Sequence, residues 1–302
     1  MCTMRRLRIG VSFAVVLAAL YGVEMAHARS SAGPTVALSV KLHAQRSSPG
    51  DLELSDDLAG VPRGESRYLT REDLLAISHP MTISPDDGNF KASTEVKALP
   101  IEDLVQGLGV PSSDMVIAIC KDKYRGHYPR AYISAHHPVL VMELDGKPLP
   151  GSPETEADDP GPYLIAHVNF KPAFKVLAHS DEPQIPWGVI RLEFRSEQTV
   201  LGAIAPRGPR VANPPAKDGF KIARQNCFRC HNNGAEGGMK SGVTWTVLGV
   251  MAANSPDFFT AYVRDPKAKN PKTEMAASPN YDDTTMRALI AYFRTFAPAE
   301  VH

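Results

Sequence analysis

The chain has 302 residues, which is enough for two domains, and 43% of them are hydrophobic, as is ordinary for a globular protein. Basic and acidic residues both number 33, so the formal net charge is zero. This balance excludes the strong positive field that nucleic-acid-binding proteins use, and we expect no nucleic-acid partner.

The N-terminal segment, residues 1–28, has the three parts of a secretory signal peptide. Three arginines precede an apolar stretch at 9–23, and Ala26-His27-Ala28 matches a small-residue cleavage site. The apolar stretch is too short to cross a bilayer comfortably, and a retained N-terminal anchor is the alternative. We predict export to the periplasm with cleavage near Ala28, which leaves a net charge of −2.

Residues 34–204 mix helix and strand signals. Thr70 and Asp73 form a capping-box pattern that opens one helix, and a second, amphipathic helix is expected at 101–108. Apolar runs predict strands at 90–96, 115–119, 139–144, 163–168 and 189–194. A turn at Asp145-Gly146 follows the third of these runs. We predict an α+β domain built on a mixed sheet.

A proline-rich stretch, residues 205–215, follows this domain. It holds four prolines and one glycine in eleven residues, a composition that favours an extended, semi-stiff linker. The remaining residues, 216–302, form the second predicted domain.

The most specific motif in the chain is Cys227-Phe228-Arg229-Cys230-His231, a C-x-x-C-H sequence. This spacing is typical of c-type haem attachment, in which two thiols bond to the haem and the histidine ligates its iron. A zinc site would need a second pair of ligands, and a thioredoxin-type pair would need a βαβ context. We predict one covalent haem c on Cys227 and Cys230, with His231 as an axial iron ligand.

Helices are predicted on both sides of the motif, at 217–225, at 256–264 and from Asp282 or Asp283 onward. Ser255 is the expected N-cap of the second helix, and Asp265-Pro266 ends it. Leu289, Tyr292 and Phe293 recur at i, i+3 and i+4, so they share one face of the last helix.

From about Lys217 to Phe296 the chain resembles a class I cytochrome c domain, which is all-α. The resemblance implies that Gly219 lies where the first and last helices cross. It also implies a methionine as the sixth ligand of the iron, and the domain has few histidines to compete with one. Met275, in an irregular loop before the last helix, matches the place of the family's ligand.

The other methionines of this region have different expected roles. Met239 is too near the motif in sequence to reach the opposite haem face, and Met251 and Met286 occupy helix-like apolar positions typical of a core. The chain also departs from the family pattern, because Ala276 replaces the usual proline after Met275. Residues 241–245 replace the segment that orients the histidine, so no hydrogen-bond partner is predicted for His231.

Short stretches of the central domain resemble the C-terminal half of the sulfite-oxidase-like molybdopterin domain, at 98–104, 121–124, 139–149 and 161–164. That family binds molybdenum through a cysteine that precedes these stretches. This chain has no cysteine between Cys2 and Cys120. We therefore expect no molybdopterin and a structural or docking role for the domain. Cys120 is the one cysteine left over in the exported chain, and we expect a buried thiol there because a lone thiol in an exported protein is usually buried.

The central histidines lack the paired spacing of a metal site, and they are His127, His136, His137, His167 and His179. We predict ordinary solvated or hydrogen-bonded side chains, with His136 and His137 on opposite faces of a strand.

These patterns favour an exported mono-haem cytochrome that transfers electrons between redox partner proteins and is not itself an enzyme. The alternative is a haem-bearing subunit or fused domain of a periplasmic oxidoreductase, for example in sulfur-compound oxidation, with a dehydrogenase or oxidase as partner. A haem sensor or peroxidase would need an open sixth site on the iron.

Overall fold

The computed structural model describes residues 40–85, 90, 92–110, 113–149, 161–177, 179–184, 186–209 and 213–298. The predicted signal peptide and residues 210–212 of the predicted linker lie outside this part of the chain. Within it, none of the helices combines the length and apolarity that crossing a membrane requires.

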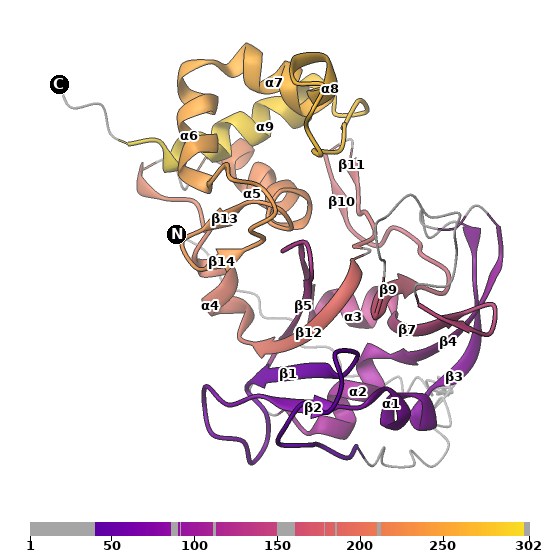
Figure 1. The fold of residues 1–302 in the computed structure, drawn as a ribbon. Coiled ribbons are helices and arrows are strands. Elements are labelled where there is room, and N and C mark those ends of the chain that lie inside the picture. Colours follow the sequence, from indigo (N-terminus) through magenta and orange to yellow (C-terminus); the bar gives the residue numbers. More distant parts are fainter. Residues whose placement is uncertain are drawn as a thin grey trace, which may run out of the picture. The chain divides into compact units, whose positions relative to one another are not determined.

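Ten strands of the described chain form one mixed sheet (Figure 1). They are β1 (Leu52–Asp56), β2 (Arg67–Leu69), β3 (His79–Ile83), β4 (Thr94–Pro100), β5 (Met115–Cys120), β6 (Arg125–Pro129), β7 (Pro138–Leu144), β8 (Lys147–Pro148), β9 (Tyr163–His167) and β12 (Trp187–Arg195). The main order is β2-β1-β12-β9-β7-β4-β3, with β5 beside β12, β6 beside β5 and β8 beside β7. The β1–β12 pair is parallel and the other pairs are antiparallel.

The sheet curls at β12, which has three partners. Its start pairs with β9, its end pairs with β1, and β5 runs along it from Val189 to Arg195. The register shifts between Trp187 and Val189 against β9. Such an irregularity bends a strand and increases its twist, so one continuous sheet can present two differently oriented parts.

The predicted α+β class is confirmed. Helix α1 (Arg71–Ile77) begins with the expected capping box of Thr70 and Asp73, and α2 (Ile101–Leu108) has the expected bounds. The strand predicted at 90–96 is wrong in its bounds, because β4 runs from Thr94 to Pro100 and continues directly into α2. Of the strands that the sequence did not predict, β1, β2, β3, β6 and β8 belong to the ten-stranded sheet.

The prediction that His136 and His137 lie on a strand is also wrong. Helix α3 (Arg130–His136) occupies this stretch, and His137 ends it in the left-handed conformation, with φ of 46°. The pattern was ambiguous because α3 has only seven residues, which is too few for helical periodicity to stand out.

Strand β5 is buried along its whole length and divides its side chains between two cores. Val116, Ala118 and Cys120 join the core formed with α1, α2 and β1. Met115, Ile117 and Ile119 point to the other face, as the twofold alternation of a strand requires. They join a second core made largely of C-terminal helices.

The C-terminal part is mainly helical (Figure 1). Its elements are α4 (Glu197–Gly202), α5 (Pro214–Asn226), the small hairpin β13 (Asn232–Asn233) and β14 (Glu236–Gly237), α6 (Trp245–Asn254), α7 (Pro256–Arg264), α8 (Pro266–Lys269), α9 (Asp283–Phe293) and the 3₁₀ turn η3 (Arg294–Phe296). A two-stranded ribbon, β10 (Lys175–Val176) with β11 (His179–Ser180), precedes β12.

Two predicted helix boundaries in this part are confirmed. Ser255 precedes α7, although its side chain makes no capping hydrogen bond, and the helix ends before Asp265-Pro266. Asp282, rather than Asp283, is the N-cap of α9, and its side chain accepts a hydrogen bond of 2.7 Å from the Thr285 N–H.

Helices α5 and α9 cross at Gly219. A Cβ atom at this position would lie 2.1 Å from the carbonyl oxygen of Ala288 and 2.6 Å from Cβ of Tyr292. Because such distances are far below van der Waals contact, only glycine permits this crossing. Leu289, Tyr292 and Phe293 are all buried at this side of α9.

The predicted division of the chain into domains 34–204 and 216–302, joined by 205–215, stays a prediction. The described residues on both sides of that stretch share the second core, which includes Ile117 on one side and Trp245 on the other. The hydroxyl of Tyr292 also donates a hydrogen bond to the carbonyl oxygen of Ile204, just before the predicted linker.

We expect Gly219→Ala to lower the free energy of unfolding by about 1–3 kcal/mol, because the added methyl group forces α5 and α9 apart. Gly202→Ala is the control. Gly202 is also helical, but a Cβ atom there would have no described atom within 4 Å, so this change should be neutral or stabilise by up to about 1 kcal/mol. Urea denaturation measures both, and equal stability of the two variants would contradict the close crossing.

Candidate functional site

The residues of the C-x-x-C-H motif form one helical turn at the end of α5. Cys227 is the C-cap of α5, and its carbonyl oxygen accepts hydrogen bonds from the N–H groups of Cys230 (3.2 Å) and His231 (3.0 Å). This turn brings together three of the four residues predicted to hold the cofactor.

His231 is oriented by a backbone carbonyl. It is 8% exposed, and its Nδ1 donates a hydrogen bond of 2.7 Å to the carbonyl oxygen of Val243. The Val243 N–H in turn bonds to the hydroxyl oxygen of Ser241, at 3.1 Å. The segment that departs from the family pattern therefore supplies the partner that the sequence did not predict.

The other ring nitrogen of His231, Nε2, forms no hydrogen bond within the described part of the chain. Burial lowers the pKa of His231, although the hydrogen bond to Val243 acts in the opposite direction. The imidazole is thus neutral and carries its proton on Nδ1, which leaves the Nε2 lone pair free to bind a metal.

The two motif cysteines are half-buried, and neither forms a disulfide with another described cysteine. Burial raises the pKa of the Cys227 thiol to about 12 and also raises the pKa of Cys230. Cys120 is a separate, buried thiol on β5, where the sequence led us to expect it.

A glycine-rich loop folds back over the motif. The Gly238 N–H donates a hydrogen bond of 2.9 Å to the carbonyl oxygen of Phe228, and the Ser241 N–H donates one of 2.9 Å to that of Cys230. A Cβ atom at Gly238 would lie 1.7 Å from the carbonyl oxygen of Arg229, so this contact requires glycine. The loop holds the turn of the motif in place.

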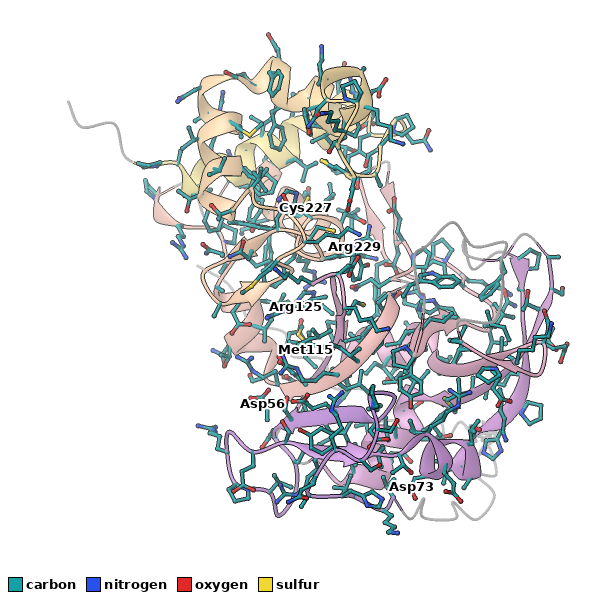
Figure 2. The ribbon with its side chains drawn as sticks, in the orientation of Figure 1. Asp56, Asp73, Met115, Arg125, Cys227 and Arg229 are labelled. Atoms are coloured by element: carbon teal, nitrogen blue, oxygen red, sulfur yellow. The ribbon has the colours of Figure 1, made fainter. Side chains whose placement is uncertain are left out.

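The hairpin of β5 and β6 contacts the motif and this loop directly. The Arg125 N–H donates to the carbonyl oxygen of Arg229 at 2.9 Å, and the Met239 N–H donates to that of Lys123 at 3.0 Å. Nζ of Lys240 lies 2.6 Å from a carboxylate oxygen of Asp122. Figure 2 shows Arg125 near Arg229 of the motif.

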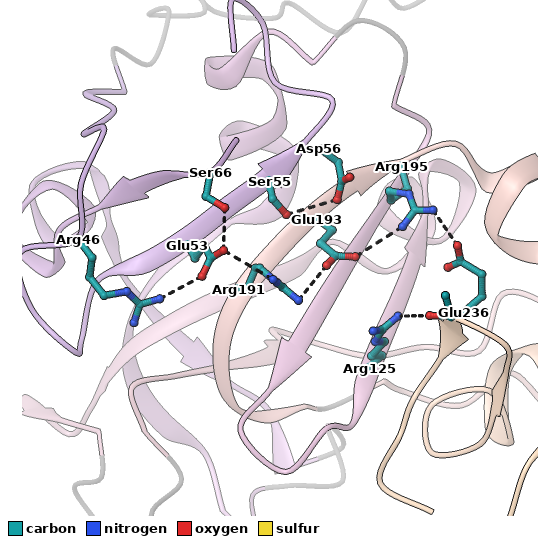
Figure 3. Close-up of polar contacts among 11 residues, drawn as sticks. Arg46, Glu53, Ser55, Asp56, Ser66, Arg125, Arg191, Glu193, Arg195 and Glu236 are labelled. Atoms are coloured by element: carbon teal, nitrogen blue, oxygen red, sulfur yellow. Dashed lines mark hydrogen bonds and ion pairs between the residues drawn. The ribbon is translucent and has the colours of Figure 1, made fainter. Parts of the chain in front are cut away.

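A ladder of alternating acidic and basic side chains crosses the sheet and ends at Glu236 on β14, next to the glycine-rich loop (Figure 3). Arg191 lies between Glu53 (3.6 Å) and Glu193 (3.1 Å), and Arg195 lies between Glu193 (3.8 Å) and Glu236 (2.7 Å). Burial raises the pKa of Glu193, and the neighbouring arginines oppose this rise. The alternation of charged and apolar residues at 191–195 was the sequence signal for this ladder.

Met275 lies in the loop between α8 and α9, half-buried. Its N–H donates a hydrogen bond of 3.2 Å to the Thr273 hydroxyl oxygen, which also accepts one from the Tyr262 hydroxyl on α7. The Ser278 N–H bonds to the carbonyl oxygen of Val263. The loop is thus fixed to α7, while Met275 is not among the described side chains of the helical core.

The other methionines lie as expected from the sequence. Met286 is 2% exposed in the core, and Met251 packs against the same core. Met239 is 43% exposed in the loop after the motif. Packing in the core explains the first two positions.

A buried polar network lies where the sheet meets α5. Nε2 of His136 contacts one carboxylate oxygen of Asp181, and the Gln225 side chain donates to the other. The hydroxyl of Tyr132 lies 3.0 Å from Nε2 of His167. These two buried histidines, His136 and His167, are hydrogen-bonded as predicted.

His137 is exposed, with its Nδ1 3.7 Å from a carboxylate oxygen of Glu102. The side chain of His179 lies outside the described residues.

His127 differs from the prediction, because it is neither solvated nor hydrogen-bonded through its ring. It is 2% exposed, and both ring nitrogens lack a partner among the described residues. The ring stacks on Phe228 of the motif at 4.6 Å between centroids. Burial lowers its pKa to about 3. The ring therefore stays neutral, and burying its two unpaired nitrogens lowers the stability of the folded protein.

No family model matches the chain, and none of the curated proteins matches it. Among the described residues, no group of three or more His, Cys, Asp or Glu side chains could hold a metal ion. The iron of the predicted haem would take only one ligand of these types, His231, so it would not need such a group.

We expect His127→Phe to stabilise the protein most at acid pH. The unfolded chain binds a proton on His127 below about pH 6.5 and the folded chain does so only near pH 3, so wild type loses stability as the pH falls through this window. Removing the ring nitrogens should raise the free energy of unfolding by about 1–3 kcal/mol at neutral pH. At pH 4 the difference between variant and wild type should be larger by about a further 3 kcal/mol.

Urea denaturation at pH 7 and pH 4 measures this difference. His79→Phe, at an exposed position on β3, is the control. It should change the free energy of unfolding by the same amount at both pH values. If His127→Phe and wild type lose the same stability on acidification, the neutral buried state of His127 is wrong.

Proposed function

We propose that the protein is an exported c-type cytochrome that carries one covalent haem c and passes single electrons between protein partners in the periplasm. The observation that carries this proposal is the hydrogen bond from Nδ1 of His231 to the carbonyl oxygen of Val243. It leaves Nε2 free on the same helical turn as two free cysteines.

The residues of this turn fit a covalent haem. Cys227 and Cys230 supply two reduced thiols one turn apart, and His231 supplies a neutral imidazole. A hydrogen bond from the second ring nitrogen to a carbonyl fixes the tautomer and makes the ligating nitrogen more basic. The haem, when bound, supplies an iron that cycles between the ferric and ferrous states.

The packing around the motif supports the resemblance to class I cytochromes c. The close crossing of α5 and α9 at Gly219 corresponds to the crossing of first and last helices in that family. Trp245 and Tyr292 form a hydrogen bond of 3.0 Å inside the core. Such a core is rigid, and a rigid site needs little reorganisation when an electron arrives or leaves.

Met275 is the proposed sixth ligand. It lies in a loop fixed to α7, and Met251 and Met286 have packing roles in the core. A haem iron held by His231 and Met275 would have no position left for a substrate. This favours electron transfer over catalysis at the iron.

The sheet part is proposed as a structural or docking module without molybdopterin. Its one cysteine, Cys120, is buried in the sheet core rather than at an accessible position. The alternative, a haem-bearing part of a periplasmic oxidoreductase, would place the catalytic centre in a partner protein. Export through the predicted signal peptide at 1–28 is part of the proposal, because haem c is attached outside the cytoplasm.

We predict that acid–acetone extraction leaves the haem on the polypeptide, because two thioether bonds hold it. The double variant Cys227→Ala/Cys230→Ala should lose the pigment, whereas Cys120→Ala should keep it. Haem staining of denaturing gels and elemental analysis measure the result, with one iron and no molybdenum per chain expected. Freely extracted haem would refute covalent attachment, and stoichiometric molybdenum would favour the oxidoreductase alternative.

We predict that Met275→Ala removes the weak charge-transfer band of ferric iron–sulfur bonding and opens the ferrous haem to carbon monoxide. A thioether favours ferrous iron, so its loss should also lower the reduction potential. Met239→Ala and Met251→Ala are the controls and should keep the band.

Absorption spectra with and without carbon monoxide read out both effects. If the band survives Met275→Ala and disappears in a control, a different sulfur ligates the iron. If the wild type already binds carbon monoxide readily, the sixth site is open, and the sensor or peroxidase function is favoured instead.

A further inference from the structure

We propose that Arg229 raises the reduction potential of the haem, and that the sheet part of the chain holds this positive charge beside the attachment site. The inference rests on the proposed function, because it concerns a haem bound to Cys227 and Cys230. It assigns a role in redox tuning to a part of the protein that otherwise serves only for structure or docking.

Arg229 stands between the two cysteines, and its guanidinium is held by neutral oxygens. Nε and Nη2 donate to the carbonyl and side-chain oxygens of Asn226, and Nη1 donates to the carbonyl oxygen of Pro183, each at 3.3 Å. Within the described part of the chain no carboxylate forms an ion pair with Arg229, although Glu182 acts on it through space.

Neighbouring cations differ from Arg229 in this respect. Arg195 is neutralised by Glu236 at 2.7 Å, and Lys240 by Asp122 at 2.6 Å. Arg229 therefore presents a positive charge that no described carboxylate compensates at ion-pair distance.

The sheet part fixes the position of this charge. The guanidinium lies 6.0 Å from the ring centroid of Tyr124, which follows β5, and Pro183 lies in the segment before β12. The Arg125 N–H also bonds to the carbonyl oxygen of Arg229. Contacts on the side chain and on the backbone thus come from residues far away in the sequence.

The effect follows from charge balance. Reduction adds one electron to the iron, so the ferrous haem carries one positive charge less than the ferric haem. A fixed cation nearby stabilises the reduced form relative to the oxidised form, and the effect is stronger away from bulk water. An arginine in a protein does not lose its proton, so the charge is permanent.

The test is a potentiometric redox titration of the full-length, haem-loaded protein. We expect Arg229→Gln to shift the ferric–ferrous equilibrium toward ferric by about tenfold or more, which is a fall of about 59 mV for a one-electron couple. Arg229→Lys keeps the charge and should shift the ferric–ferrous equilibrium by less than about threefold. Arg224→Gln removes the same charge from a partly exposed, ion-paired position on α5 and should shift the ferric–ferrous equilibrium by less than about twofold.

Several outcomes would overturn the inference. These are an unchanged potential in Arg229→Gln, a fall of equal size in Arg224→Gln, or a fall in Arg229→Lys as large as that in Arg229→Gln. If Arg229→Gln does not fold, Arg229→Met provides a second uncharged variant of similar length. Absence of covalent haem in the wild type would instead refute the proposed function, so the two failures are distinguishable.

Discussion

The structure depends on a single strand whose two faces belong to two different cores. Side chains of β5 alternate between the sheet core and the helical core, and all six of its residues are buried. A strand in this position cannot slip by one residue, because a slip would exchange the two sets of side chains. The register of β5 therefore fixes where the following turn, residues 121–124, meets the helical part.

That turn contacts the C-x-x-C-H motif and the loop that follows the motif. Backbone hydrogen bonds join Lys123 to Met239 and Arg125 to Arg229, and the ring of Tyr124 lies near the Arg229 guanidinium. The C-x-x-C-H turn is thus held from two directions. Its own glycine-rich loop covers one side, and a hairpin of the sheet supports the other.

Buried polar groups add specificity to this arrangement at an energetic cost. Asp181 binds His136 from the sheet part and Gln225 from α5, and Gln184 bonds to both backbone groups of His127. Buried hydrogen bonds of this kind contribute little net stability, but leaving one unmade is expensive. Alternative packings of α5 against the sheet would leave such groups unpaired, which disfavours them.

The sequence by itself determined the features that depend on local spacing. One turn of helix places Cys227, Cys230 and His231 together, and Thr70 and Asp73 cap α1. Both of these follow from backbone geometry within a few residues. The crossing at Gly219 was expected from the family resemblance alone, and its tight contact with Ala288 on α9 comes from the tertiary structure.

Only the tertiary structure decided the features that depend on distant residues. The carbonyl of Val243 as the partner of His231, the neutral oxygens around Arg229 and the buried ring of His127 come from loops and strands that approach through folding. Short elements such as α3 were misread because seven residues carry too little periodicity to distinguish a helix from a strand. Contacts of this kind are set by long-range packing, which composition and spacing along the chain do not encode in a readable form.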